Sequence, residues 1–170
     1  MRKITFVAAA DVGATNVRLA IVDSEGVIRS RHEAPLTHEN PEQVTRGIAA
    51  DLAQLLAASP EVHRIEAVGV SFAGRVDTVT GRVMTLDPSA ALRWDGVPIS
   101  EILSEGLGVD VWIDNDANAA ALGEGWIGSA QGMSDYIFVA FGSAFGLGVV
   151  IDGRLHRGKH SCRAKCRFSQ

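Results

Sequence analysis

The sequence predicts a mixed α/β fold in which three antiparallel strands come first and helices then alternate with strands. Short strand-like runs occupy residues 4–10, 17–22 and 27–33. The last two are joined by Asp23-Ser24-Glu25-Gly26, in which Asp and Gly are turn formers. Apolar residues then recur with helical spacing over 44–56, and strand-like and helix-like segments alternate after it. This order predicts an α/β domain built on a mixed five-stranded sheet.

The first helix is predicted from a start signal and from one apolar face. Asn40 can cap the helix, Pro41 suits its first position, and Gln43 sits where a capping box places it. Ser59-Pro60 is expected to end it. The apolar face consists of Val44, Ile48, Leu52, Leu55 and Leu56, and it should pack on the sheet.

Later elements follow the same alternation. The expected order is strand 65–71, helix 99–105, strand 109–113 and an Ala-rich helix over 118–126. Gly106 and Gly108 are expected to end the short helix, and the stretch between residue 71 and Trp94 is expected to be irregular.

A domain boundary is predicted at Gly132, so that residues 1–132 form the first domain. Residues 133–158 would begin a second, incomplete domain with strands over 136–140 and 147–155. The remaining residues, 159–170, form a basic tail.

The composition is that of an ordinary globular protein and argues against nucleic-acid and membrane partners. The chain is 46% hydrophobic and has a net charge of -4, so it has no positive field to hold a polyanion. The apolar run 4–10 is far shorter than the ~18 residues that span a bilayer, which favours a strand over a signal peptide. Only Cys162 and Cys166 are present, so a disulfide framework is not expected and a cytoplasmic location is the default.

The first chemical motif is Asp11-Val12-Gly13-Ala14-Thr15-Asn16, between the first two strands. A tight turn with a glycine can point backbone N–H groups at an anion, Thr15 adds a hydroxyl donor, and Asp11 can hold a hydrated Mg²⁺. These are the requirements of a nucleotide phosphate site. An ordinary turn is the alternative, because Asp and Gly are common turn residues.

The second motif is Asp114-Asn115-Asp116-Ala117-Asn118, where a strand is followed by a helix. A carboxylate there can accept a proton from a hydroxyl nucleophile, and a neighbouring amide can orient hydroxyl groups. Helix capping is the alternative, but one cap is needed and four polar residues are present. A third stretch, Gly142-Ser143-Ala144-Phe145-Gly146-Leu147-Gly148, has glycines within a strand pair, which fits either a second phosphate contact or a plain hairpin.

Together these motifs resemble the ROK family (repressor, open reading frame, kinase), whose ribonuclease H-like fold belongs with hexokinase and actin. The resemblance covers residues 4–158. Its blocks are DVGATNVR at 11–18, GVSFAGRVD at 69–77, WDGVP at 94–98 and DNDANAAALGE at 114–124. The last block is the most specific.

The resemblance implies a role for each matching residue. Asp116 would be the general base for a sugar hydroxyl. Sugar contacts would come from Asn115, Gly74 and Ser89. The phosphates of Mg-ATP would face Asp11, Gly13, Thr15, Asn16, Gly142 and Ser143, with Asp11 holding Mg²⁺ through water.

The sequence also departs from the family pattern. Ala73 stands where Pro is usual, Ser89 stands where a sugar-contacting Asn is usual, and Ser143-Ala144 replaces Thr-Gly. After Gly158 the family continues with a sugar-contacting segment, a Cys-rich zinc site and an adenosine-binding lobe. The segment from Lys159 does not match these features, which suggests a reading-frame shift near codon 159.

The zinc site of the family is therefore expected to be absent. His160, Cys162 and Cys166 match no standard zinc spacing and leave a structural site one ligand short.

The implied function is ATP-dependent phosphorylation of a hexose, glucose first, in a shortened chain with little turnover. The alternative is a non-enzymatic sugar sensor of the ROK repressor type. Such repressors carry a DNA-binding segment before the first phosphate motif, and that motif begins at residue 11 here. Faces that the missing lobe normally covers would favour self-association, so a homodimer is an expected assembly.

Overall fold

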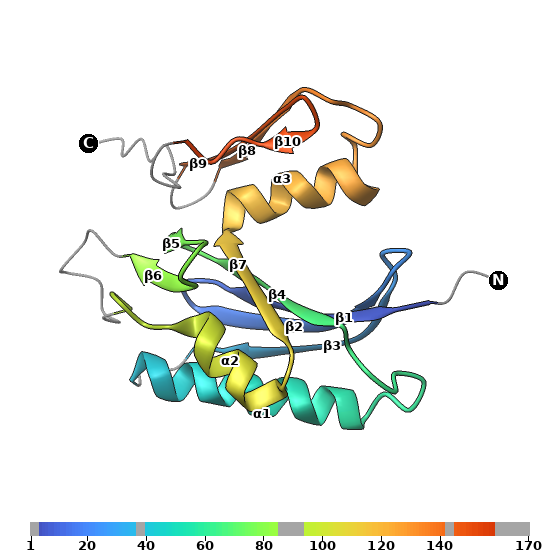
Figure 1. The fold of residues 1–170 in the computed structure, drawn as a ribbon, viewed down its shortest axis with the longest axis vertical. Helices are drawn as coiled ribbons and strands as arrows, with labels where there is room; N and C mark the ends of the chain where they lie inside the picture. The colour runs from blue at the N-terminus through green and yellow to red at the C-terminus, as the bar shows by residue number, and fades with distance from the viewer. Residues whose placement is uncertain (1–3, 37–39, 85–93, 142–144, 159–170) are drawn as a thin grey trace.

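The computed structural model describes residues 4–36, 40–84, 94–141 and 145–158. Its strands are β1 (Phe6–Val12), β2 (Asn16–Asp23), β3 (Ile28–Pro35), β4 (Ala67–Phe72), β5 (Arg75–Asp77), β6 (Arg82–Met84), β7 (Asp110–Asn115), β8 (Tyr136–Phe141), β9 (Phe145–Ile151) and β10 (Arg154–Leu155). Its helices are α1 (Pro41–Ala57), α2 (Ile99–Leu107) and α3 (Asp116–Ile127). Figure 1 shows their arrangement.

The main sheet is mixed and has the strand order β3-β2-β1-β4-β7. Strands β1, β2 and β3 form the antiparallel part, whereas β4 runs parallel to β1 and β7 runs parallel to β4. Helices α1 and α2 lie on one face of this sheet (Figure 1). The predicted mixed five-stranded α/β sheet is confirmed.

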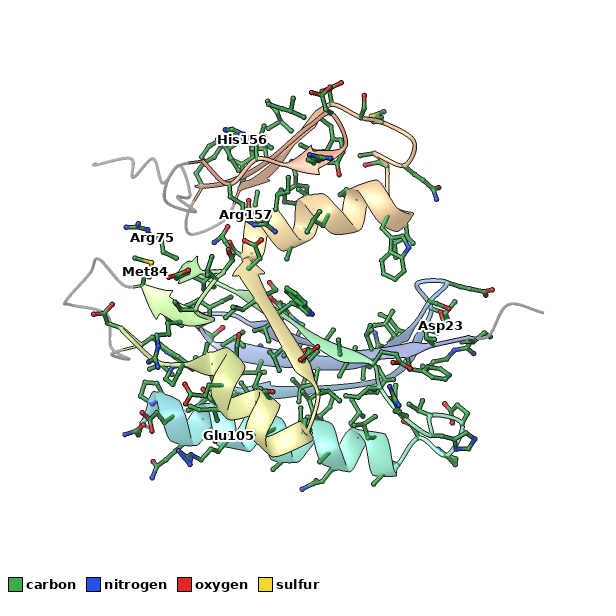
Figure 2. The ribbon with its side chains drawn as sticks, in the orientation of Figure 1. Asp23, Arg75, Met84, Glu105, His156 and Arg157 are labelled. Atoms are coloured by element: carbon green, nitrogen blue, oxygen red, sulfur yellow. The ribbon has the colours of Figure 1, made fainter. Side chains whose placement is uncertain are left out.

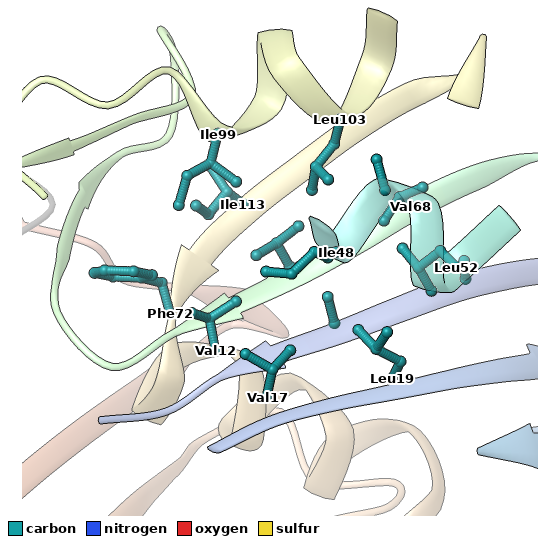
Figure 3. Close-up of a cluster of buried hydrophobic side chains, with 14 of the residues drawn as sticks. Val12, Val17, Leu19, Ile48, Leu52, Val68, Phe72, Ile99, Leu103 and Ile113 are labelled. Carbon is teal, nitrogen blue, oxygen red and sulfur yellow. The ribbon is translucent and has the colours of Figure 1, made fainter. Parts of the chain in front are cut away.

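The core lies between this face and the two helices (Figure 3). Alternate residues of each strand point to one face, so Ala8, Ala10 and Val12 of β1 are all buried on the helix side. Leu52 of α1 and Leu103 of α2 are fully buried against them. The sheet thus removes the apolar face of each helix from water. This burial of apolar surface is the main contribution to the stability of a helix packed on a sheet.

The second, three-stranded sheet has the order β10-β9-β8 and packs against α3. The Oη of Tyr136 donates a hydrogen bond to the carbonyl oxygen of Ala121 at 2.9 Å. A Cβ added at Gly148 would overlap Ala117 and Ala121, so the absence of a side chain permits this close packing. By these contacts α3 is associated with the second sheet, while the boundary at Gly132 stays a prediction.

Several element boundaries differ from those expected. Helix α2 continues through Gly106 and ends at Leu107, where it is capped by Gly108, whose backbone is left-handed and whose N–H donates to the carbonyl of Ser104. Helix α3 begins at Asp116, two residues earlier than expected, because Asn115 and not a later residue caps it.

The stretch that was expected to be irregular contains the hairpin of β5 and β6, whose turn is closed by Asp77. The hydrogen bond from the Val79 N–H holds the pKa of Asp77 below its usual value.

The expected strand over 147–155 is divided by a turn at Asp152 and Gly153, both of which have positive φ. Short polar turns of this kind leave little periodic signal in the sequence.

Among the described residues, every helix is too short or too polar to cross a lipid bilayer.

Candidate functional site

Three parallel strands of the main sheet end at the same edge, and each carries a polar residue close to that end. In the strand register Asp11 of β1 pairs with Ser71 of β4, and Ser71 pairs with Asp114 of β7. Ligands of open α/β sheets bind in the crevice outside the carboxyl ends of such strands. The two predicted motifs, which are about a hundred residues apart in the sequence, therefore meet at one edge.

The first motif forms the turn between β1 and β2. The N–H of Gly13 donates to the carbonyl of Asn16 at 3.0 Å, and a Cβ at Gly13 would press on that same oxygen. Thr15 is exposed at the tip, so its hydroxyl is accessible. The Nδ2 of Asn16 donates to Glu33 at 3.0 Å.

The carboxylate of Asp11 is half exposed and already has two partners. Its Oδ1 accepts a hydrogen bond from the Ser71 hydroxyl at 2.8 Å, and its Oδ2 lies 3.4 Å from Arg18. Arg18 also lies 3.3 Å from Glu33. Ser71 thus holds the Asp11 carboxylate in one orientation. Its Oδ2 faces the solvent-exposed guanidinium of Arg18, which another cation can replace.

The second motif forms the junction between β7 and α3. The Oδ1 of Asn115 accepts from the N–H of Ala117 at 3.1 Å, which caps α3. Its Nδ2 donates to the carbonyl of Gly74 at 2.7 Å, and the residue is only 2% exposed. Asn115 therefore caps α3 and ties the loop after β4 to the start of that helix.

Asp116 is the first residue of α3 and is half-buried, so its carboxylate is not enclosed in the interior. Its Oδ1 accepts from the N–H of Ala117 at 2.8 Å. A carboxylate in the first turn of a helix is stabilised by the positive end of the helix dipole. Asp116 is thus placed on the edge that also holds Asp11, two strands away.

Two residues at this edge were not singled out individually by the sequence reasoning. The buried carboxylate of Asp114 accepts from the Asn115 N–H, from Asn118 and from Arg157. Asp114 belongs to the polar cluster that the sequence did reveal, but Arg157 belongs to none of the motifs named in the sequence. Three of the predicted contacts, Ser89, Gly142 and Ser143, lie outside the described residues.

Comparison with known proteins identifies the family of the chain. Residues 7–165 match the sequence pattern of the ROK family. The chain belongs to the ROK family. The match extends past Gly158 to residue 165, whereas residues 159–170 were predicted to form a tail that does not match the family. The limit of that tail stays a prediction.

Curated ROK relatives include both kinases and repressors. The chain is 32% identical over 155 residues to a glucokinase of Streptomyces coelicolor, covering 91% of this chain and 46% of that protein. It is 30% identical over 150 residues to a xylose repressor of Caldicellulosiruptor bescii, covering 87% of this chain and 37% of that protein. The chain thus spans about half the length of the curated relatives it matches, or less.

A solved structure of the family shares the fold. The ROK glucokinase from Streptomyces griseus, in complex with glucose and AMPPNP, superposes with a TM-score of 0.78 at 31% identity. The match covers 94% of this chain and 48% of that one. The actin- and hexokinase-like fold class predicted from the sequence is therefore confirmed.

Proposed function

We propose that this chain forms the sugar-side part of a ROK kinase that phosphorylates a hexose with ATP. The observation that supports the proposal is the strand register that places Asp11, Ser71 and Asp114 in one row, with Asp116 two residues beyond. Neighbouring strands lie about 4.8 Å apart, so the ends of β1 and β7 are separated by roughly 10 Å. A phosphate at one end and a sugar hydroxyl at the other fit that span.

In the proposed reaction Asp116 is the general base. The hexose hydroxyl oxygen forms a bond to the terminal phosphorus of ATP, the bond from that phosphorus to ADP breaks, and the hydroxyl proton passes to the Asp116 carboxylate. Its place in the first turn of α3, where its Oδ1 accepts from the Ala117 N–H, fixes the carboxylate, which suits a base that acts by positioning.

The turn at residues 13–15 suits a phosphate, since Gly13 leaves room for the backbone and Thr15 offers a hydroxyl. Mg²⁺, when bound, would offset the phosphate charge, and Asp11 would hold it through water. The side chain of Asp11 is 43% exposed, so a hydrated ion can reach it. Arg18 would then exchange Asp11 for a phosphate oxygen or for solvent.

The sugar contacts assigned to Asn115 and Gly74 require a local rearrangement. The Nδ2 of Asn115 donates one of its two hydrogens to the Gly74 carbonyl, and the residue is only 2% exposed. The loop after β4 must therefore move before the second hydrogen can meet a sugar hydroxyl. Glucose is the first candidate substrate, because a glucokinase is among the relatives and a glucose complex is among the similar structures.

Ligand-induced thermal stabilisation tests this proposal. The midpoint of heat denaturation is measured with glucose, other hexoses and xylose, each with and without Mg-ATP. A ligand present at a hundred times its Kd stabilises the folded chain by about 2.7 kcal/mol, so a bound hexose should raise the midpoint of heat denaturation. An unchanged midpoint with every sugar would contradict the proposal.

Asp116→Asn supplies the chemical test, with Asp110→Asn at the exposed start of β7 as the matched control. Loss of a general base lowers phosphoryl transfer by ~10² to 10⁴. The control should retain the rate of the unaltered chain, measured as hexose phosphate formed. Equal rates in the two variants, both above the rate of hexose phosphate formation without protein, would remove Asp116 from the mechanism.

A sugar sensor is the second candidate function, because a xylose repressor is also among the relatives. A sensor would be stabilised by sugar alone. Mg-ATP would then add nothing to the denaturation midpoint, and Asp116→Asn would change affinity without any loss of turnover.

A further inference from the structure

The carboxylate of Asp114 is buried and is held by three hydrogen-bond donors. Its Oδ1 accepts from the Asn115 N–H at 2.7 Å and from the Nδ2 of Asn118 at 2.8 Å. Its Oδ2 accepts from the Nε of Arg157 at 2.8 Å. With a side chain only 11% exposed, Asp114 depends on these donors in place of water.

Arg157 reaches Asp114 from a distant part of the chain. It follows β10, 43 residues after Asp114, and Figure 2 shows it near the junction of β7 and α3. The N–H of the preceding residue, His156, donates to the carbonyl of Val149 at 2.7 Å, which anchors the segment to β9. The arginine thus joins the second sheet to the end of a strand of the first.

The ion pair also determines how the next residues are held. With Oδ2 engaged by Arg157, Oδ1 is directed at the N–H of Asn115 and the amide of Asn118, which lie on either side of Asp116. Removing the arginine would leave a buried carboxylate short of a partner, so the carboxylate would turn toward water. Both bonds that flank Asp116 would then be disturbed.

We propose that Arg157 is a positioning residue for Asp116, acting through the carboxylate of Asp114. The proposal rests on the function proposed above, in which Asp116 takes the hydroxyl proton. The geometry of the base then depends on how the second sheet docks, because Arg157 lies in the segment that follows β10 of that sheet. The docking of the second sheet and the placement of Asp116 are thereby coupled.

The test compares Arg157→Met with Arg157→Gln. Methionine removes both the charge and the donor, whereas the Nε2 of glutamine lies where the Nε of arginine lies and restores the donor without the charge. Arg154→Met on exposed β10 is the matched control. Glucose affinity is measured by calorimetry, and exchange of the Asn115 and Ala117 amide hydrogens is measured by mass spectrometry or NMR.

We expect Arg157→Met to weaken glucose binding about tenfold, Arg157→Gln to recover part of the loss, and Arg154→Met to have no effect. Amide exchange at Asn115 and Ala117 should accelerate in the same order, while exchange in β8 and β9 stays unchanged. Equal behaviour of the methionine and glutamine variants, or accelerated exchange throughout β8 and β9, would overturn the proposal in favour of simple packing.

Failure of the proposed function has a different signature. If the unaltered chain binds no hexose, the function is wrong, and amide exchange alone still decides whether Arg157 fixes the segment around Asp116. Unchanged exchange at Asn115 in Arg157→Met would overturn the positioning role whatever the affinity.

Discussion

At the scale of single residues, Asp23 shows how one buried carboxylate secures a turn. It accepts hydrogen bonds from the N–H groups of Glu25 and Val27, both at 2.9 Å, and pairs with Arg29. The bond from Val27, above all, holds the pKa of Asp23 below its usual value of 3.8. Because the folded-state pKa is depressed, the stabilisation is present above pH 3.8 and is lost as the pH falls through the folded-state pKa.

We therefore expect Asp23→Asn to lower the midpoint of urea denaturation at neutral pH. The midpoint should also decline less steeply than that of the unaltered chain as the pH falls from about 5 to about 2. Asparagine keeps an acceptor for the turn but loses the charge that Arg29 meets. Urea denaturation at several pH values measures this dependence. Asp110→Asn is the control, since Asp110 is exposed. A decline as steep in Asp23→Asn as in the unaltered chain would contradict the expectation.

At the scale of elements, the contact of α3 with β9 is decided by a missing side chain. A Cβ at Gly148 would overlap the carbonyl of Ala117 and the methyl of Ala121, and backbone atoms yield little. Gly148→Ala should lower the free energy of unfolding by about 1–3 kcal/mol, measured by urea denaturation. Gly69→Ala, in strand β4 with open space around it, should be close to neutral. Equal effects would show that the interface is looser than the structure indicates.

At the scale of the whole molecule, the described part of the second sheet exposes one apolar face. Ile137, Val139 and Phe141 of β8 are 63%, 39% and 82% exposed, and they pair across the strands with Val149, Leu147 and Phe145. Exposed apolar patches of this kind bind hydrophobic dyes and favour association. The expected homodimer stays a prediction.

A dye that fluoresces on apolar surfaces should therefore bind the folded chain, and the double variant Ile137→Thr/Val139→Thr should reduce that signal together with any concentration-dependent light scattering. Threonine retains the β-branched shape that suits a strand, so the fold should persist. Val79→Thr, at a 93% exposed position in the turn between β5 and β6, is the control. An unchanged signal in the double variant would place the dye elsewhere.

Much of the fold could be predicted from the sequence because its signals are local. The apolar spacing of α1, its cap at Asn40 and the Asp23 turn each depend on residues within a few positions of one another, and all three are present in the structure. The β5–β6 hairpin could not be predicted, since three-residue strands carry almost no periodicity. The start of α3 was expected two residues too late for a different reason, because several neighbouring polar residues can each cap a helix.

By itself, the sequence determined the three helices and the longer strands of the main sheet, and which polar clusters follow them. Only the tertiary structure decided that Asp11, Ser71 and Asp114 form one row, that the amide of Asn115 bonds to Gly74, and that Arg157 meets Asp114. The physical reason is distance along the chain. Pairings between residues 41 to 60 positions apart are selected by the packing of the whole sheet and its helices, which no local pattern encodes.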